Sequence, residues 1–209
     1  EAWLKEGAQG TMAYLDRSRE KRLDPRRVLD GARSGIVLAV SYHRPGHAAA
    51  GEVGAKGDQG WVARYACHGD YHEVLWPRLR EFCQHLEALG GPGTRALGYT
   101  DTGPVLERDL AQRAGVGFIG KHTNLIGRRW GNWLLLAEVL TTLELEPDAS
   151  EHNRCGSCVR CLEACPTGAI PQPFRLDARR CLAYLTIEFR GSIPEAMRPA
   201  MGNRVFGCD

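Results

Sequence analysis

The chain has 209 residues, a formal net charge of +2 and 43% hydrophobic residues. This length predicts one large domain or two small ones, and no apolar run approaches the ~20 residues that a membrane-spanning helix needs. The small net charge does not by itself indicate a nucleic-acid partner, and no secretory signal peptide is visible.

The first forty residues contain one helical region and one strand. Residues 1–30 are basic and helical in character, and Asp24-Pro25 and Gly31 predict the start and end of a short helix. The apolar, branched run from Ile36 to Val40 predicts a buried strand. Residues 43–60 are rich in glycine and predict a long loop.

Helices and strands continue to alternate up to residue 147. Apolar side chains at helical spacing predict a helix over residues 71–89, and a second helix over residues 106–114 ends at Gly115. The nearly continuous apolar stretch from Trp133 to Leu140 predicts a central strand. Strands separated by helices indicate an α+β or α/β-like first domain, and Pro147-Asp148 begins a linker.

The glycines at positions 115, 117 and 120 match the pattern G-x-G-x-x-G. A dinucleotide site would need a strand before this pattern and a helix after it. Here a helical segment precedes the pattern, so we interpret it as a backbone turn.

Several polar groups in the first domain have both a structural and a functional interpretation. Cys67, His68 and His72 have loose spacing, which favours a solvated helix start over a metal site. The N-terminal arginines can contact phosphates, but nearby acidic residues favour a charged helix face. Asp101 begins a turn signal, and it either caps the following helix or belongs to a functional site.

Cys155, Cys158, Cys161 and Cys165-Pro166 have the spacing of the bacterial ferredoxin run for [4Fe–4S] clusters. In that run the first three thiolates hold one cluster and the fourth holds another. Zinc sites usually separate two cysteine pairs more widely, and most disulfides between cysteines this close would be strained.

Two more cysteines, Cys181 and Cys208, join Cys165 as ligands of the second cluster. Two cubane clusters need eight thiolates, and these positions supply six. We therefore expect the native protein to continue beyond Asp209 into another cysteine run. Exposed cluster cysteines suit a reducing cytoplasm.

Six blocks, in order along nearly the whole chain, resemble epoxyqueuosine reductases. Arg64-Tyr-Ala with Asp70-Tyr-His forms the first, and Asp101-Thr-Gly-Pro-Val-Leu-Glu-Arg forms the second. The other blocks are residues 114–121, 155–168, 176–188 and 202–209.

The resemblance implies an oxidoreductase that reduces the epoxide of epoxyqueuosine in a tRNA anticodon stem-loop to queuosine, the last step of queuosine biosynthesis. Electrons would pass from an external donor through two [4Fe–4S] clusters to base-off cobalamin. The resemblance further implies a cytoplasmic monomer without membrane association. Its fold would be α+β: a cobalamin-binding catalytic domain of the reductive-dehalogenase type over residues 1–147, then a ferredoxin-like module over residues 148–209, with both ends incomplete.

The resemblance also assigns site residues. Asp101 is the general acid that protonates the leaving oxygen, which requires a carboxylic acid whose pKa is raised, most simply by burial beside the corrin. Ala183 stands where the family usually has serine, and the glycine turn would place Leu125 near the corrin. The implied cobalamin contacts are Arg22, Ala63, Asp101, Leu125, Leu136 and Ala183, and the implied cluster ligands are Cys155, Cys158, Cys161, Cys165, Cys181 and Cys208.

Two other functions remain open at this stage. A dicluster ferredoxin would carry electrons on the same cysteines but would bind no cobalamin. A reductive dehalogenase is usually exported with a twin-arginine signal, which is not seen in this sequence, and its acid is typically a tyrosine.

Overall fold

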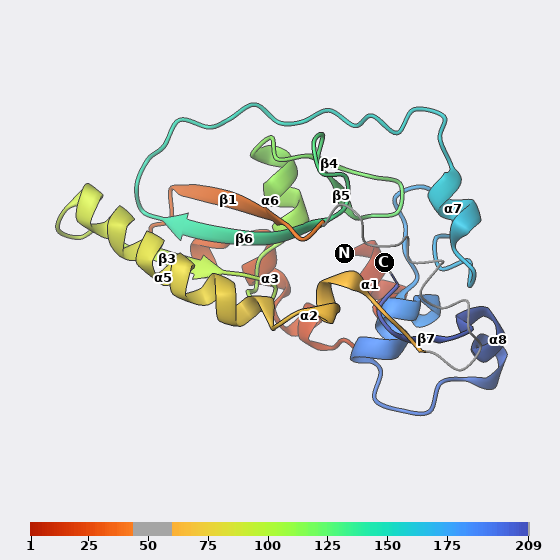
Figure 1. Cartoon of the computed structure of the whole chain (residues 1–209). Helices are drawn as coiled ribbons and strands as arrows, with labels where there is room; N and C mark the ends of the chain where they lie inside the picture. Colours follow the sequence, from red (N-terminus) through yellow and green to blue (C-terminus); the bar gives the residue numbers. More distant parts are fainter. Residues whose placement is uncertain (44–59, 209) are drawn as a thin grey trace.

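The computed structural model describes residues 1–43 and 60–208 (Figure 1). The glycine-rich loop predicted over residues 43–60 lies almost entirely outside these residues. At the centre is an antiparallel sheet in the order β1-β6-β3, formed by Ser34–Ser41, Leu134–Thr141 and Ala96–Tyr99. The predicted central strand is therefore confirmed as β6. The mixed helix-and-sheet architecture is also confirmed, and its antiparallel pairing is of the α+β type.

One face of the sheet is covered by the long helix α5 (Tyr71–Gly90), as Figure 1 shows. Leu79, Cys83 and Leu86 of this helix pack against Ala137 and Val139 of β6. The helix begins at Asp70, whose side chain accepts the backbone N–H of His72, and ends before a glycine with φ of +77°. The helix predicted over residues 71–89 is confirmed.

The opposite face carries the shorter helix α6 (Glu107–Arg113), which confirms the helix predicted over residues 106–114. Leu29, Val105 and Leu140 form the core on this side. Because successive side chains of a strand point to opposite faces, Glu138 lies on the same side of β6 as Leu140. A carboxylate therefore enters the core beneath α6.

The predicted buried strand over Ile36 to Val40 is confirmed as a strand, but its full burial is wrong. This segment lies in β1 at the edge of the sheet, where it pairs with β6. Leu38 and Val40 are 37% and 39% exposed. An edge strand has one neighbour, so its apolar side chains lack cover on one side.

The basic N-terminal region is less regular than predicted, because residues Gly7 and Gly10 have positive φ and separate short turns of helix. Asp24 caps the short 3-10 helix η1 (Pro25–Arg27), and Gly31 follows it with φ of +73°, as predicted. Arg26 pairs with Asp24 and Arg27 with Glu20, which supports the charged-face interpretation for these two arginines. The helices of this region are α1 (Ala2–Lys5), α2 (Tyr14–Arg17) and α3 (Arg19–Leu23).

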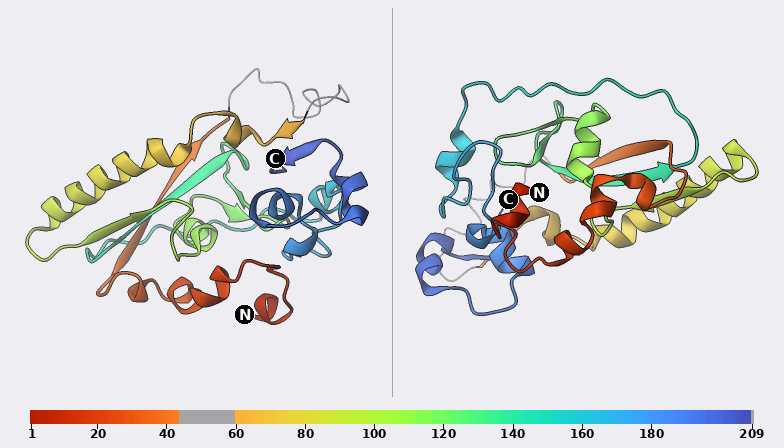
Figure 2. Two further views of the ribbon diagram at one scale, coloured as in Figure 1. Left: turned by 90° about the horizontal axis from the view of Figure 1, so that it is seen from below. Right: turned by 180° about the vertical axis from the view of Figure 1, so that it is seen from behind.

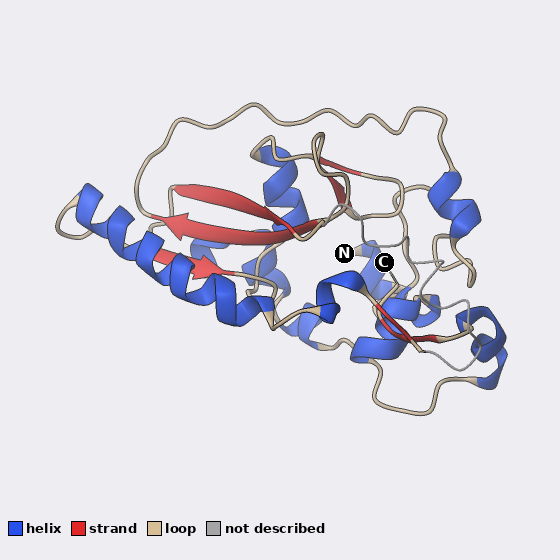
Figure 3. Ribbon diagram, viewed as in Figure 1, coloured by secondary structure: helices blue, strands red, loops and turns tan. Residues whose placement is uncertain are grey.

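After β6 a long irregular segment leads to the C-terminal part of the chain (Figure 3). That part contains α7 (Arg160–Ala164), η3 (Ala178–Arg180), the π-helix η4 (Tyr184–Glu188), η5 (Glu195–Met197), α8 (Arg198–Met201) and β7 (Arg204–Phe206). Its core includes Leu182, Tyr184 and Leu185, against which Trp3 and Met12 pack. The N-terminal segment therefore lies against the C-terminal part (Figure 2).

A second connection between the two parts is the parallel pair β2 (Trp61–Val62) and β7. The 3-10 helix η2 (Arg64–Cys67) follows β2. Both sets of contacts cross the predicted domain boundary at residues 147/148, which stays a prediction. In the described part of the chain, no helix has the length and apolar character that crossing a membrane requires.

Candidate functional site

Asp101 lies on a short loop after β3, and its backbone has φ of +59°, in the left-handed region that few non-glycine residues adopt. The loop is fastened on both sides of this residue. The Thr100 hydroxyl donates to the Leu136 carbonyl over 2.8 Å, and the Arg22 guanidinium donates to the Val105 carbonyl over 2.9 Å. A strained residue held by its surroundings is typical of functional sites.

The side chain of Asp101 is 65% exposed. The protein itself therefore does not bury Asp101, and its burial beside a corrin stays a prediction. Asp101 also does not cap α6, because the residue at the N-cap of that helix is Leu106. Of the two interpretations of this turn, capping is wrong.

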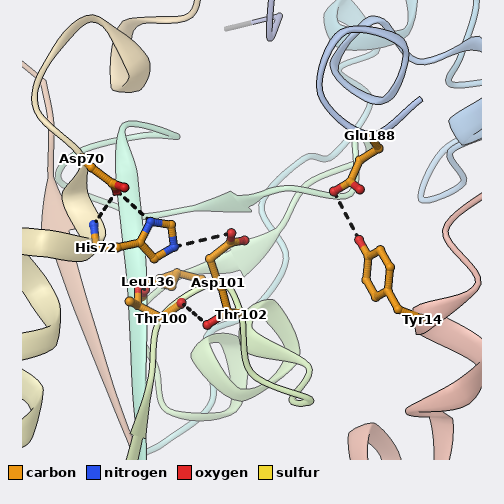
Figure 4. Close-up of polar contacts among 8 residues, drawn as sticks. All are labelled: Tyr14, Asp70, His72, Thr100, Asp101, Thr102, Leu136 and Glu188. Carbon is orange, nitrogen blue, oxygen red and sulfur yellow. Dashed lines mark hydrogen bonds and ion pairs between the residues drawn. The ribbon is translucent and has the colours of Figure 1, made fainter. Parts of the chain in front are cut away.

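His72 faces Asp101 across a gap of 3.8 Å between its Nε2 and the Asp101 Oδ2 (Figure 4). Its Nδ1 lies 2.8 Å from the Oδ1 of Asp70. The same Asp70 oxygen accepts the backbone N–H of His72, and that hydrogen bond is the main reason that the pKa of Asp70 is lowered. Asp70, His72 and Asp101 thus form one chain of polar groups.

The predicted helix start at His72 is confirmed, because His72 lies in the first turn of α5, but its side chain is not fully solvated. Its side chain is 27% exposed and turns toward Asp101. The spacing Asp70-Tyr-His72 is the sequence signal that could have indicated the position of His72. An aspartate at a helix N-cap accepts the backbone N–H of the second residue after it. The position of Asp101 opposite His72 depends on tertiary packing.

Tyr71 is the third group beside Asp101. Burial raises the pKa of its phenol, and the negative charge of the neighbouring Asp101 carboxylate raises the pKa further. Tyr71 therefore stays a neutral hydrogen-bond donor at neutral pH.

A cavity of about 320 Å³ lies next to the Asp101 loop. Three cations, Arg17, Lys21 and Arg22, line it together with Tyr14, Ser18, Thr102 and Pro104. The Tyr14 hydroxyl lies 3.3 Å from Glu188 of η4 (Figure 4). This cavity can receive an anionic or amide-rich group close to the Asp101 loop.

The predicted cobalamin contacts differ in accessibility. Ala63 and Leu125 are buried, at 0% and 5% exposure, so their side chains offer almost no surface to a ligand. Arg22, Leu136 and Ala183 are half-buried, and the Arg22 guanidinium is already bonded to Ser18 and Val105. Together with the exposed Asp101, four of the six predicted positions therefore have side-chain surface that a flat macrocycle could contact.

The glycine pattern at residues 115–120 forms a backbone turn, as predicted, and this turn opens a hairpin that was not predicted. It follows α6 and leads into β4 (Phe118–Ile119), which pairs with β5 (Leu125–Ile126). A Cβ atom on Gly117 would lie 2.5 Å from the Ile126 carbonyl oxygen, so only glycine allows this close approach.

The loop between Cys155 and Cys158 is fastened to this hairpin. The Lys121 ammonium donates to the carbonyls of Gly156 and Cys158 over 2.8 and 2.9 Å. Asn153 donates to the Ile119 carbonyl and accepts the backbone N–H of Cys155. The hairpin and the first cysteines therefore form one connected unit.

Cys165 has the surroundings of a thiolate ligand. Its sulfur accepts the backbone N–H of Ala169 over 3.2 Å and lies 3.6 Å from the Thr167 hydroxyl. Burial raises the pKa of this thiol, but the hydrogen bonds from Thr167 and from backbone N–H groups outweigh burial and lower it.

The remaining cysteines are less tightly grouped. Cys181 lies between η3 and η4, and Cys208 follows β7. No cysteine of the described residues forms a disulfide. Within residues 1–43 and 60–208, no three His, Cys, Asp or Glu side chains come together to hold a metal ion, so the assignment of six cysteine ligands stays a prediction.

Comparison with known proteins favours one of the open alternatives. A family model described as epoxyqueuosine reductase QueG, DUF1730, matches residues 22–102, and one described as a 4Fe-4S double cluster binding domain matches residues 154–209. The epoxyqueuosine reductase of Xanthomonas campestris pv. campestris is 44% identical over 209 residues, which are 100% of this chain and 58% of that protein. Along its whole length the chain is therefore similar to epoxyqueuosine reductases. It spans a little over half the length of this curated relative.

Solved structures of the family have the same fold. An epoxyqueuosine reductase with a tRNA-Tyr epoxyqueuosine-modified stem loop superposes with a TM-score of 0.80 at 34% identity, over 91% of this chain and 50% of that one. The enzyme from Bacillus subtilis, with an aspartate-bearing catalytic loop swung out of the active site, superposes with a TM-score of 0.80 at 33% identity and the same coverage.

Proposed function

We propose that this chain is the catalytic part of a reductase that converts epoxyqueuosine in tRNA to queuosine, with Asp101 as its general acid. The observation that carries the proposal is the position of Asp101 in a chain similar to this family. Its carboxylate projects from a fastened loop toward His72 and Tyr71, beside a cationic cavity.

Removal of an epoxide oxygen as water consumes two electrons and two protons. When bound, cobalamin and two [4Fe–4S] clusters supply the electrons. The residues of the chain handle the protons: Asp101 donates one to the departing oxygen and must then regain one. His72, 3.8 Å from Asp101 and supported by Asp70, provides a route from the surface.

The structural support for the iron–sulfur clusters differs from the support for cobalamin. Thiolate stabilisation at Cys165 and the fastened loop at Cys155 and Cys158 fit a cluster-binding role for the cysteine run. For cobalamin, the accessible surfaces of Arg22, Leu136 and Ala183 fit a corrin contact, whereas Ala63 and Leu125 offer at most backbone atoms. We include cobalamin on the family resemblance.

The proposed partners follow from the same reasoning. Two cations of the cavity, Arg17 and Lys21, suit the phosphates of a tRNA anticodon stem-loop. An external donor delivers the electrons. We further propose that the enzyme works as a cytoplasmic monomer and that residues 1–147 hold the catalytic site and residues 148–209 the clusters.

The complete protein, loaded anaerobically with cofactors, can be tested on an epoxyqueuosine-containing stem-loop. We expect Asp101→Asn to bind cobalamin normally and to lose at least 100-fold in turnover, because an amide cannot donate the proton. Asp109→Asn is the matched control, since Asp109 lies on α6 and pairs with Arg113. Near-native turnover of Asp101→Asn would show that another group is the acid.

A dicluster electron carrier gives a different outcome in the same experiment. It would show cluster absorption but no cobalamin bands and no queuosine. A reductive dehalogenase would bind cobalamin and leave the epoxide intact. Either result contradicts the proposed function.

A further inference from the structure

Two glutamates lie in the interior below the Asp101 loop. Glu138, on the central strand β6, is 0% exposed and faces α6, whose first residue is Glu107. Three of their carboxylate oxygens are buried and have no hydrogen-bond partner among the described residues. These are both oxygens of Glu138 and the Oε1 of Glu107. Buried polar atoms without partners are rare and costly.

The two carboxyl groups face each other, and Glu107 also faces the backbone N–H of Asp101. Carboxylate oxygens are acceptors, so two ionised carboxylates in contact lack a donor. One proton removes this conflict: a protonated Glu138 donates to Glu107, and the Glu107 carboxylate accepts the Asp101 N–H.

The surrounding charges favour this proton on Glu138. Burial raises its pKa to about 9, and the negative charge of Glu107 adds to the effect. Burial also raises the pKa of Glu107, but the Asp101 N–H, Glu138 and Arg108 oppose that rise. The other ionisable groups facing the pair are Tyr71 from α5, Tyr99 from β3 and Asp101 from the loop.

Asp101 needs such support because its backbone lies in the left-handed region, with φ of +59°. Thr100 and Arg22 fasten the loop before and after it, and the Glu107 carboxylate is positioned to hold Asp101 itself.

We propose that Glu107 and Glu138 share one proton and, as a pair of positioning residues, hold the backbone of Asp101 in the orientation that its proton donation requires. The positioning role rests on the proposed function, whereas the shared proton does not. When the pair loses its proton, two negative charges repel each other in a dry interior. Glu107 then leaves the Asp101 N–H, and the loop is released.

Infrared spectroscopy of the complete protein tests the shared proton without any activity. We expect a carbonyl band of a buried protonated carboxyl group at pH 7, which disappears at alkaline pH. The band should be absent from Glu138→Gln and present in Asp109→Asn. Absence of the band from the wild type, or its persistence in Glu138→Gln, overturns the proposal.

Hydrogen exchange and turnover test the positioning role. Glutamine at position 138 still donates to Glu107 but cannot ionise, whereas leucine cannot donate. At pH 7 we expect at least tenfold faster exchange of the Asp101 amide and at least tenfold lower kcat in Glu138→Leu, and near-normal values in Glu138→Gln. The alkaline fall of kcat should also be weaker in Glu138→Gln than in the wild type.

Equal losses in both variants at every pH would show a purely structural role and overturn the proposal. If Glu138→Leu does not fold, the wild-type band and the pH profile of Glu138→Gln still decide. If the wild type does not reduce epoxyqueuosine, the proposed function fails while the infrared result stands on its own.

Discussion

At the scale of single residues, the candidate site combines one exposed acid with partners that are partly or wholly buried. Asp101 is 65% exposed, while His72 is 27% exposed and Glu138 is fully buried. Asp101 is therefore open to the solvent, with His72 as the proposed proton carrier beside it, and the interior pair is shielded from the same solvent. These opposite environments lead to two predictions.

His72→Gln should lower turnover of the complete enzyme by roughly 100-fold, the lower end of the usual contribution of a proton-transferring side chain. Glutamine keeps a polar group at this position but cannot carry the proton between Asp70 and Asp101. Rapid-quench measurement of queuosine formation checks this. The control is His85→Gln, on α5 but outside the described site; equal rates for His72→Gln and wild type would remove His72 from the proton route.

Glu138 should make the stability of the protein depend on pH. Its pKa is about 9 in the folded state, against 4.5 for an ordinary glutamate. The unfolded chain loses this proton first as pH rises, so the free energy of unfolding should fall between these values, by up to about 1.4 kcal/mol per pH unit. Denaturant titrations of wild type and Glu138→Gln measure this, and the variant should show a clearly shallower fall. Parallel curves would contradict a protonated Glu138.

At the scale of elements, the hairpin of β4 and β5 joins the catalytic part of the fold to the cysteine loop. Lys121 makes this connection through two carbonyl groups, at Gly156 and Cys158. Hydrogen bonds from a charged donor stabilise by about 1.5–3 kcal/mol each when they are well made. Lys121 also places a positive charge beside the predicted cluster loop.

Lys121→Met should therefore loosen the loop and lower the reduction potential of the cluster held there. Removal of a positive charge destabilises the reduced, more negative form of a cluster. Potentiometric titration followed by electron paramagnetic resonance measures the potential, and iron release to a chelator should be several-fold faster. Lys5→Met, on α1, is the control. An unchanged potential and unchanged iron release would show that Lys121 serves only the apoprotein.

The elements also show what local sequence can predict. Helix α5 and the turn after α6 were predictable, because helical spacing and glycines act over a few residues. The order of the strands in the sheet was not predictable. The apolar runs of β1 and β6 look alike in the sequence, and their pairing partners decide which strand lies at the exposed edge.

At the scale of the whole molecule, both termini of the chain contribute to the same region. Trp3 and Met12 pack into the core formed by Leu182 and Tyr184, and β2 pairs with β7. These contacts place the predicted catalytic and cluster-binding parts against each other. Such proximity suits electron transfer within one polypeptide.

Only part of the candidate site was predictable from the sequence. Asp101 and the cysteine run stood out by motif, and His72 and Glu107 lie within blocks of the resemblance, but the contacts of His72 with Asp101 and of Glu107 with Glu138 were not predicted. Glu138 lies within an apolar strand, and its contact with Glu107 depends on how α6 packs on β6. Long-range packing of this kind leaves no signal in the spacing of residues.

The central claim is that Asp101 donates the proton in reduction of epoxyqueuosine. Nucleoside analysis of tRNA tests it most directly, in a strain that lacks the reductase and carries the complete protein or its Asp101→Asn variant. We predict queuosine with the wild type and accumulated epoxyqueuosine with Asp101→Asn, at equal protein levels. Queuosine in both strains, or in neither, would contradict the account.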